Sequence, residues 1–102
     1  MLETVITKPI YRILTDLTRE ERVEVALPLA MKDWVRLQLQ EARAQRRQFE
    51  QLYGMDFAAF KRDWQAGRIP DAHSYEVERV YWEWEAAITD EERLQQIAES
   101  LP

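Results

Sequence analysis

The feature that most constrains the fold is residues 19–53, a long segment with a helical pattern of apolar residues and no glycine. Gly54 follows it, and we expect this glycine to end the helix in the left-handed conformation. Pro28 lies inside the segment, where a proline costs roughly 3 kcal/mol in a helix interior. We therefore expect either a bend near residues 25–27 or a second helix that starts at Pro28.

The apolar residues of this segment form a seam with heptad-like spacing. Positions 35, 39, 42, 46, 49 and 53 alternate steps of four and three residues, and Arg46 breaks the seam. Residues 29–53 alone would span roughly 35–40 Å as a helix, which is long for a small monomer. We therefore predict an intertwined homodimer. The predicted dimerisation residues are Val5, Leu27, Met31, Trp34, Val35, Leu39 and Phe49.

The N-terminal residues suggest two short elements before the long helix. Residues 2–8 are rich in β-branched side chains and predict one short strand, which would pair with another copy or remain extended. Pro9 suits the first position of a helix over residues 9–16, with an apolar stripe. Residues 18–21 form a capping box, which predicts that the long helix starts there.

Capping residues also divide the second half of the chain into helices. Asp56 predicts the start of a helix that Gly67 ends, and Asp71 or Ser74 predicts the start of a fourth helix that runs to about residue 88. Residues 89–92 form a second capping box and predict a separate terminal helix. The predicted fold class is all-α, in one domain, with at most one short strand. Within this single domain, residues 1–54 would dimerise and residues 55–102 would carry an acidic docking segment.

Charge is distributed unevenly along the chain. The 102 residues include 14 Lys and Arg against 19 Asp and Glu, which gives a net charge of −5. Residues 1–68 contain 12 basic and 10 acidic residues (net +2), whereas residues 69–102 contain 2 and 9 (net −7). Such a one-sided field steers charged partners and says little about the fold. It is typical of a solvated acidic face or of a segment that docks onto a basic partner.

Composition excludes several classes of chemistry. The chain has no cysteine and one histidine, so disulfides, thiolate nucleophiles and ordinary zinc sites are ruled out. His73 and Glu76 have a metal-ligand spacing, but without a second such motif we interpret His73 as a surface residue near a helix start. No spacing singles out a catalytic carboxylate pair, so we expect neither an enzyme nor a cofactor.

The expected location is the cytoplasm. No apolar run approaches the ~18–20 residues of a membrane span. The N-terminus also lacks the basic and apolar regions of a signal peptide.

The densest cluster of aromatic and acidic residues is segment 75–85. Trp84 shares a helix face with Val80, whereas Trp82 lies about 200° away from Trp84, so both indoles cannot enter one small core. Trp82 would therefore pack against a neighbouring helix or subunit, or it would belong to an exposed docking face. The predicted partner-binding residues are Tyr75, Glu78, Trp82, Glu83 and Glu85.

A small basic patch is also present, made of Arg43, Arg46, Arg47, Lys61 and Arg62. It is either a solvated face or a contact for phosphates or for the acidic segment of a second copy. Binding to nucleic acid is a minor alternative, because this half of the chain carries a net charge of only +2.

Three short motifs resemble a family of small prokaryotic antitoxins. Residues 52–60 match a YGM-[S/D]-F-xx-F turn, residues 64–71 match a short helix that ends in glycine, and residues 76–86 match an acidic E-x-D-Y-x-E-W-E helix. These motifs are similar to antitoxins of type II toxin–antitoxin operons that pair with TumE-like toxins. Arg79 and Val80 depart from the pattern, which has an acidic residue before the tyrosine.

The resemblance implies a homodimer in which the acidic helix, residues 76–85, masks the basic site of a small toxin. Such families often repress their own operon, although no basic strand supports this here. The alternatives from other classes are a self-associating helical scaffold protein and a small DNA-binding operon repressor.

Overall fold

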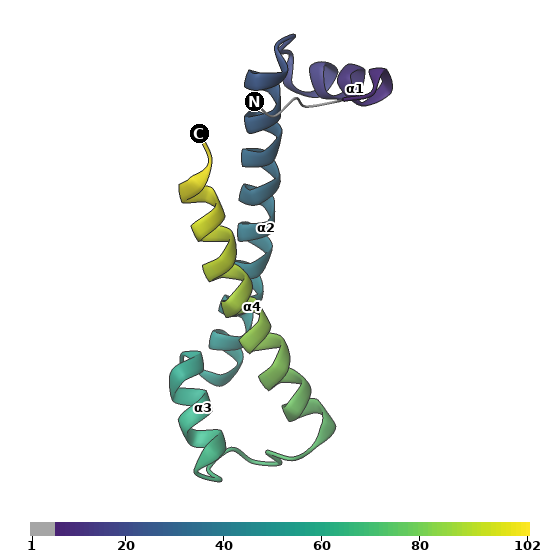
Figure 1. Cartoon of the computed structure of the whole chain (residues 1–102). Coiled ribbons are helices and arrows are strands. Elements are labelled where there is room, and N and C mark those ends of the chain that lie inside the picture. The colour runs from purple at the N-terminus through teal and green to yellow at the C-terminus, as the bar shows by residue number, and fades with distance from the viewer. Residues whose placement is uncertain (1–5) are drawn as a thin grey trace.

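The computed structural model describes residues 6–102, and this part of the chain is all-helical, as predicted (Figure 1). It contains α1 (Lys8–Thr18), α2 (Val23–Tyr53), α3 (Phe57–Gln65) and α4 (Tyr75–Ser100). No strand occurs among the described residues.

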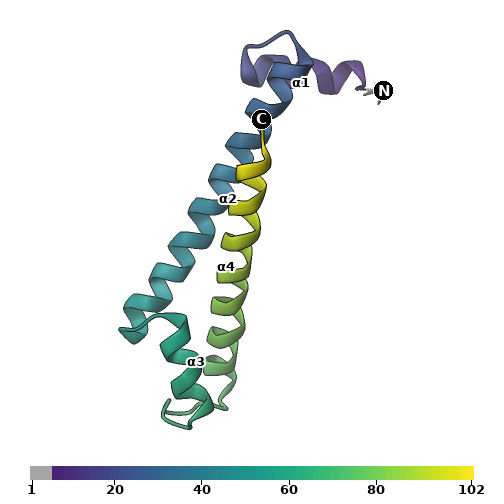
Figure 2. The ribbon, with the colours of Figure 1, turned by 60° about the vertical axis from the view of Figure 1, so that its left-hand side comes forward.

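The helices form an elongated hairpin. α2 and α4 lie side by side and run in opposite directions, α3 lies at the closed end, and α1 projects sideways from the start of α2 (Figures 1 and 2). The molecule measures 57 × 24 × 20 Å, with a radius of gyration of 19.6 Å. A compact domain of this length would have a radius of gyration of about 13 Å. Much of the helical surface therefore has no partner among residues 6–102.

Three of the predicted helix boundaries are confirmed by their capping interactions. Gly54 ends α2 in the left-handed conformation (φ 65°), and its N–H donates to the carbonyl of Glu50 over 2.7 Å. Asp56 accepts a hydrogen bond from the N–H of Ala59 and starts α3. Ser74, rather than Asp71, starts α4.

Neither predicted capping box starts a helix. Thr18 is the last residue of α1, and its hydroxyl donates to the carbonyl of Leu14 over 2.8 Å. α2 begins after Arg22, which makes no side-chain capping bond. Residues 89–92 lie inside α4, which is continuous. The apolar seam of α4 continues past them to Leu94, so packing against α2 keeps the helix intact there.

Pro28 lies within α2, so the alternative in which a second helix starts at this residue is wrong. Pro28 has no N–H to donate to the carbonyl four residues earlier, so one backbone hydrogen bond is missing near the start of the helix. Ala26, two residues before it, is completely buried. Packing of α1 against this part of α2 supports the helix where the hydrogen bond is missing.

The predicted N-terminal strand is wrong where the structure describes it. Ile6 and Thr7 have no regular structure, and Lys8 already begins α1. Val5 and the other residues of the predicted strand lie outside the described part. Pro9 is in the first turn of α1, as expected for a residue without an N–H.

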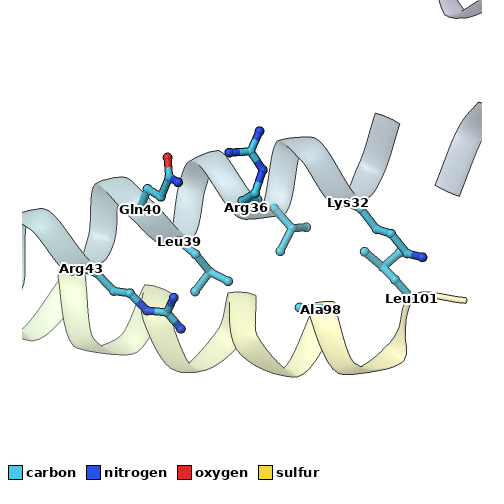
Figure 3. Close-up of a pocket in the computed structure, with 8 residues that line it drawn as sticks. Lys32, Arg36, Leu39, Gln40, Arg43, Ala98 and Leu101 are labelled. Carbon is cyan, nitrogen blue, oxygen red and sulfur yellow. The ribbon is translucent and has the colours of Figure 1, made fainter. Parts of the chain in front are cut away.

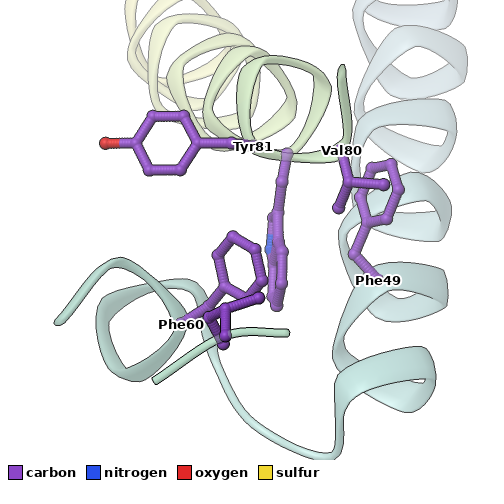
Figure 4. Close-up of a cluster of buried hydrophobic side chains, with 6 residues drawn as sticks. Phe49, Phe60, Val80 and Tyr81 are labelled. Carbon is purple, nitrogen blue, oxygen red and sulfur yellow. The ribbon is translucent and has the colours of Figure 1, made fainter. Parts of the chain in front are cut away.

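The main core is an aromatic cluster at the closed end of the hairpin. Phe49 of α2, Phe60 of α3, and Val80 and Tyr81 of α4 converge there (Figure 4). Trp84 is completely buried among them, with ring centroids 5.0 Å from Phe60 and 5.6 Å from Phe49. The cluster therefore joins α2, α3 and α4, and it confirms the predicted inward face of α4.

A smaller apolar cluster lies nearer the open end, and an ion-pair network separates it from the aromatic cluster. The smaller cluster consists of Val35, Leu39 and Leu94, with Leu101 packed against it. Between the two clusters, Glu91 of α4 binds α2. Its Oε2 accepts from Arg46 Nε over 2.7 Å, and its Oε1 accepts from Arg43 Nε over 3.3 Å.

Glu91 and Arg46 occupy equivalent positions in two matching seams. In α4, positions 77, 80, 84, 87, 91, 94 and 98 alternate steps of three and four residues, and position 91 is the one charged member. In α2 the charged member is Arg46, which also binds Glu50. The interruption seen in the sequence of α2 is therefore matched by an interruption in α4, and the two residues pair.

The network shifts the pKa of Glu91. Burial by itself raises the pKa of this carboxyl group, but the hydrogen bonds and charges of Arg46 and Arg43 outweigh burial and hold the pKa below its usual value. The folded state therefore binds fewer protons than the unfolded state near pH 4. The pair stabilises the fold above the ordinary glutamate pKa of about 4.3, and this stabilisation is lost as the pH falls through the lower folded pKa.

The first prediction concerns the two tryptophans of α4. Trp84→Ala should lower the free energy of unfolding by about 3–5 kcal/mol, because it empties the centre of the aromatic cluster. Trp82 is 62% exposed, so Trp82→Ala should change it by no more than about 0.5 kcal/mol. Urea unfolding followed by circular dichroism measures both, and equal losses would contradict the assignment of Trp84 to the core.

The second prediction concerns the ion-pair network. Glu91→Gln should lower the free energy of unfolding at pH 7 by about 1–3 kcal/mol, because Arg43 loses its carboxylate partner and Arg46 keeps only that of Glu50. The difference from wild type should shrink as the pH falls below about 4.3 and through the lower folded pKa of Glu91, because only the wild-type chain has a carboxylate to protonate at this position. Glu92→Gln, at the exposed neighbouring position, is the matched control. A Glu92→Gln loss as large as that of Glu91→Gln would contradict the role of the network.

Candidate protein-binding surface

The predicted docking residues of α4 form an outward stripe. Tyr75 is 80% exposed and Trp82 is 62% exposed, on the side of α4 opposite Trp84. Positions 75, 78, 82 and 85 follow steps of three and four residues, so they lie along one face of the helix. We name this stripe, made of Tyr75, Glu78, Trp82 and Glu85, the α4 outer face.

Two carboxylates flank the indole of Trp82. Glu78 lies one turn before it and Glu85 one turn after it, and both side chains are partly exposed. Glu78 Oε1 lies 3.7 Å from Nδ1 of His73, which is a charged pair only when the histidine is protonated. An exposed indole between two carboxylates can bind a lysine or arginine side chain through the ring face and through charge-assisted hydrogen bonds.

Glu83 is separate from the α4 outer face. Its Oε1 accepts a hydrogen bond from Nη1 of Arg79 over 3.3 Å, one turn earlier in the helix. Both side chains are exposed, so the pair contributes little to stability. Arg79 is one of the two residues that depart from the antitoxin pattern, and it pairs with one of the five predicted partner-binding residues.

The predicted dimerisation residues fall into two groups. Val35, Leu39 and Phe49 are buried within one chain, where α4 covers them. Leu27, Met31 and Trp34 are 37%, 40% and 64% exposed. The seam of α2 therefore already has a partner in its own chain, and the prediction of self-association rests on the exposed group.

Two of the predicted basic residues are occupied within the chain. Arg43 and Arg46 bind Glu91, so they are not a free surface for phosphates. A groove of about 310 Å³ lies beside Arg43, between α2 and the end of α4. Figure 3 shows Lys32 and Arg43 extending toward α4 along this groove, whereas Arg36 and Gln40 point away from α4.

Residues 6–102 contain neither a candidate metal site nor a helix that could cross a membrane. No group of three or more His, Asp or Glu side chains in this range could hold a metal ion. No helix in the described part is both long and apolar enough to cross a membrane.

The chain matches no protein-family model, no curated protein and no solved structure at a significant level. The resemblance of its short motifs to antitoxins therefore stays a prediction. The features of the structure that bear on the function of the chain are its exposed surfaces.

Proposed function

We propose that this chain is an antitoxin-like protein-binding module that masks a small basic protein with the α4 outer face. The observation that carries the proposal is the exposure of Trp82 between Glu78 and Glu85, with Tyr75 on the same stripe. Tryptophan and tyrosine are enriched among the residues that dominate binding energy in protein interfaces. The two carboxylates add selectivity for a cationic partner.

The charge of the whole segment supports the same kind of partner. Residues 69–102 carry a net charge of −7, and two of their nine acidic residues flank Trp82. A concentrated negative field accelerates association with a basic protein and disfavours acidic ones. The contribution of this field falls with added salt.

The position of α4 in the fold supports high affinity. Trp84 and Glu91 hold the inner side of α4 against α2 and α3, so the outer face is already helical before a partner arrives. A preformed surface loses less conformational entropy on binding than a segment that folds on binding. The α4 outer face can therefore bind as a rigid ridge.

A self-associating helical scaffold protein is the second candidate function, and it is favoured by the apolar surface at the other end of the hairpin. Leu17 and Trp34 are 75% and 64% exposed there. This function and the first are compatible, because the α4 outer face and this apolar surface lie on different parts of the elongated molecule.

The third prediction tests the proposed partner surface. The tagged chain should be expressed with its flanking genes, and we expect a small basic neighbour to co-purify in a fixed ratio. Trp82→Ala should weaken that complex by about 30-fold or more, as expected for a central aromatic contact. Glu78→Gln combined with Glu85→Gln should mainly slow association and reduce its salt dependence. Isothermal titration and stopped-flow mixing measure these effects.

The matched control is Leu52→Ala, which removes an equally exposed apolar side chain from the end of α2. It should leave binding unchanged. Circular dichroism should show wild-type helicity for every variant. If Trp82→Ala bound the neighbour as tightly as wild type, the α4 outer face would not be the partner site.

A further inference from the structure

The first half of the described chain carries most of the exposed large apolar residues. Nine of the thirteen exposed large apolar residues lie between positions 10 and 37, on α1 and the first half of α2. Contiguous apolar patches of this kind mark interaction sites. The surface is separate from the α4 outer face.

α1 presents an apolar stripe that no other element of the described chain covers. Ile10, Ile13 and Leu17 follow steps of three and four residues and are 57%, 60% and 75% exposed. In α1 only Leu14 is buried. An isolated helix of 11 residues is marginal in water, so a helix this short needs packing on its apolar face.

An apolar groove suited to a short helix lies between α2 and the end of α4. It has a volume of about 560 Å³, and its lining includes Met31, Trp34, Leu94, Ile97 and Leu101. It extends along α2 from residue 30 to residue 38, a length of about 12 Å. The apolar stripe of α1, from Ile10 to Leu17, is about 10 Å long, so it fits the groove.

Trp34 connects this groove to α1. Together with Leu17, Leu29 and Leu37, it also lines a second groove, of about 410 Å³, in the angle between α1 and α2. The apolar surface is therefore continuous from α1 across Trp34 to the end of α4. A large aromatic side chain at the centre of such a surface is the usual dominant contact of an interface.

We infer that the occupant of the α2–α4 groove is α1 of a second copy of this chain, in a reciprocal two-fold dimer centred on Trp34. The α1 of the same chain is held elsewhere. A short connection, residues 19–22, joins it to α2, and the hydroxyl of Tyr11 donates to the carbonyl of Glu21 over 2.6 Å. α1 consequently projects sideways from α2 (Figure 1).

Charge identifies a second copy as the partner. Residues 6–41 contain six basic and six acidic residues, so two copies of this region meet without net repulsion. The net charge of −7 lies in residues 69–92, whereas residues 93–101, the part of α4 that completes the groove, contain one basic and one acidic residue. A two-fold interface must be complementary to itself, and the neutral apolar half meets that condition. The inference does not rest on the proposed partner of α4.

The first test is the oligomeric state of the purified chain. Sedimentation equilibrium should give 2 × 12.3 = 24.6 kDa at micromolar concentration. Trp34→Ala and Leu17→Asp should each raise the dissociation constant by at least about 30-fold. Trp82→Asp, on the α4 outer face, is the control and should leave the dimer intact. A wild-type monomer at tens of micromolar, or a dimer unaffected by Trp34→Ala, would overturn the inference.

The second test asks whether α1 of one chain lies in the groove of another by introducing single cysteines. The sequence contains no cysteine, so only the introduced ones can form disulfides. Chains with Ile13→Cys and chains with Ile97→Cys should form a mixed interchain disulfide when they are mixed and oxidised. Chains with Leu52→Cys should not link to either. If the double variant Ile13→Cys/Ile97→Cys links within a single chain instead, α1 covers its own groove and the reciprocal dimer is wrong.

Discussion

The ion pair between Arg46 and Glu91 is the interaction on which the arrangement of the hairpin depends. Both residues occupy seam positions that are otherwise apolar, between the aromatic cluster and the smaller cluster of Val35, Leu39 and Leu94. A charged pair in a partly buried seam stabilises a fold less than apolar packing does, but it penalises every alignment that separates the two charges. We infer that it fixes how far α4 slides along α2. With that alignment set, Trp84 enters the aromatic cluster.

This alignment decides which surfaces remain free. The seams use the inner faces of α2 and α4, so Trp82 and Tyr75 are left on the outer face of α4. α4 ends at Ser100, and Leu101 lies beside Lys32, so α1 and the first turns of α2 extend beyond α4. Trp34 lies beside the end of α4 but remains 64% exposed. One free surface is acidic and aromatic, and the other is neutral and apolar. The elongated shape separates them, so a dimer formed by one surface can bind a basic partner with the other.

Local sequence signals predicted where the helices begin and end better than they predicted how the helices pack. Gly54, Asp56 and Ser74 act through their own backbone neighbours, so their caps could be predicted from the sequence. The capping box at residues 89–92 wrongly predicted the start of a separate helix, because packing of the α4 seam against α2 overrides this local signal. For the same reason Val35, Leu39 and Phe49 were correctly predicted as a seam, whereas their partner proved to lie in the same chain. The sequence did not predict the role of Glu91, because the fourth helix was expected to end at about residue 88. Helix geometry alone predicts that Trp82 and Trp84 lie on opposite sides of α4, whereas the exposure of Trp82 is found only in the structure.

A charge-reversal cycle tests the central claim most directly. Arg46→Glu and Glu91→Arg, made singly and together, are compared by urea unfolding at pH 7. Each single reversal places like charges together in the seam and should lower the free energy of unfolding. The double reversal restores an opposite pair and should be more stable than the sum of the single effects by about 1 kcal/mol or more. Additive losses in the double variant would show that the pair does not hold α4 in place on α2.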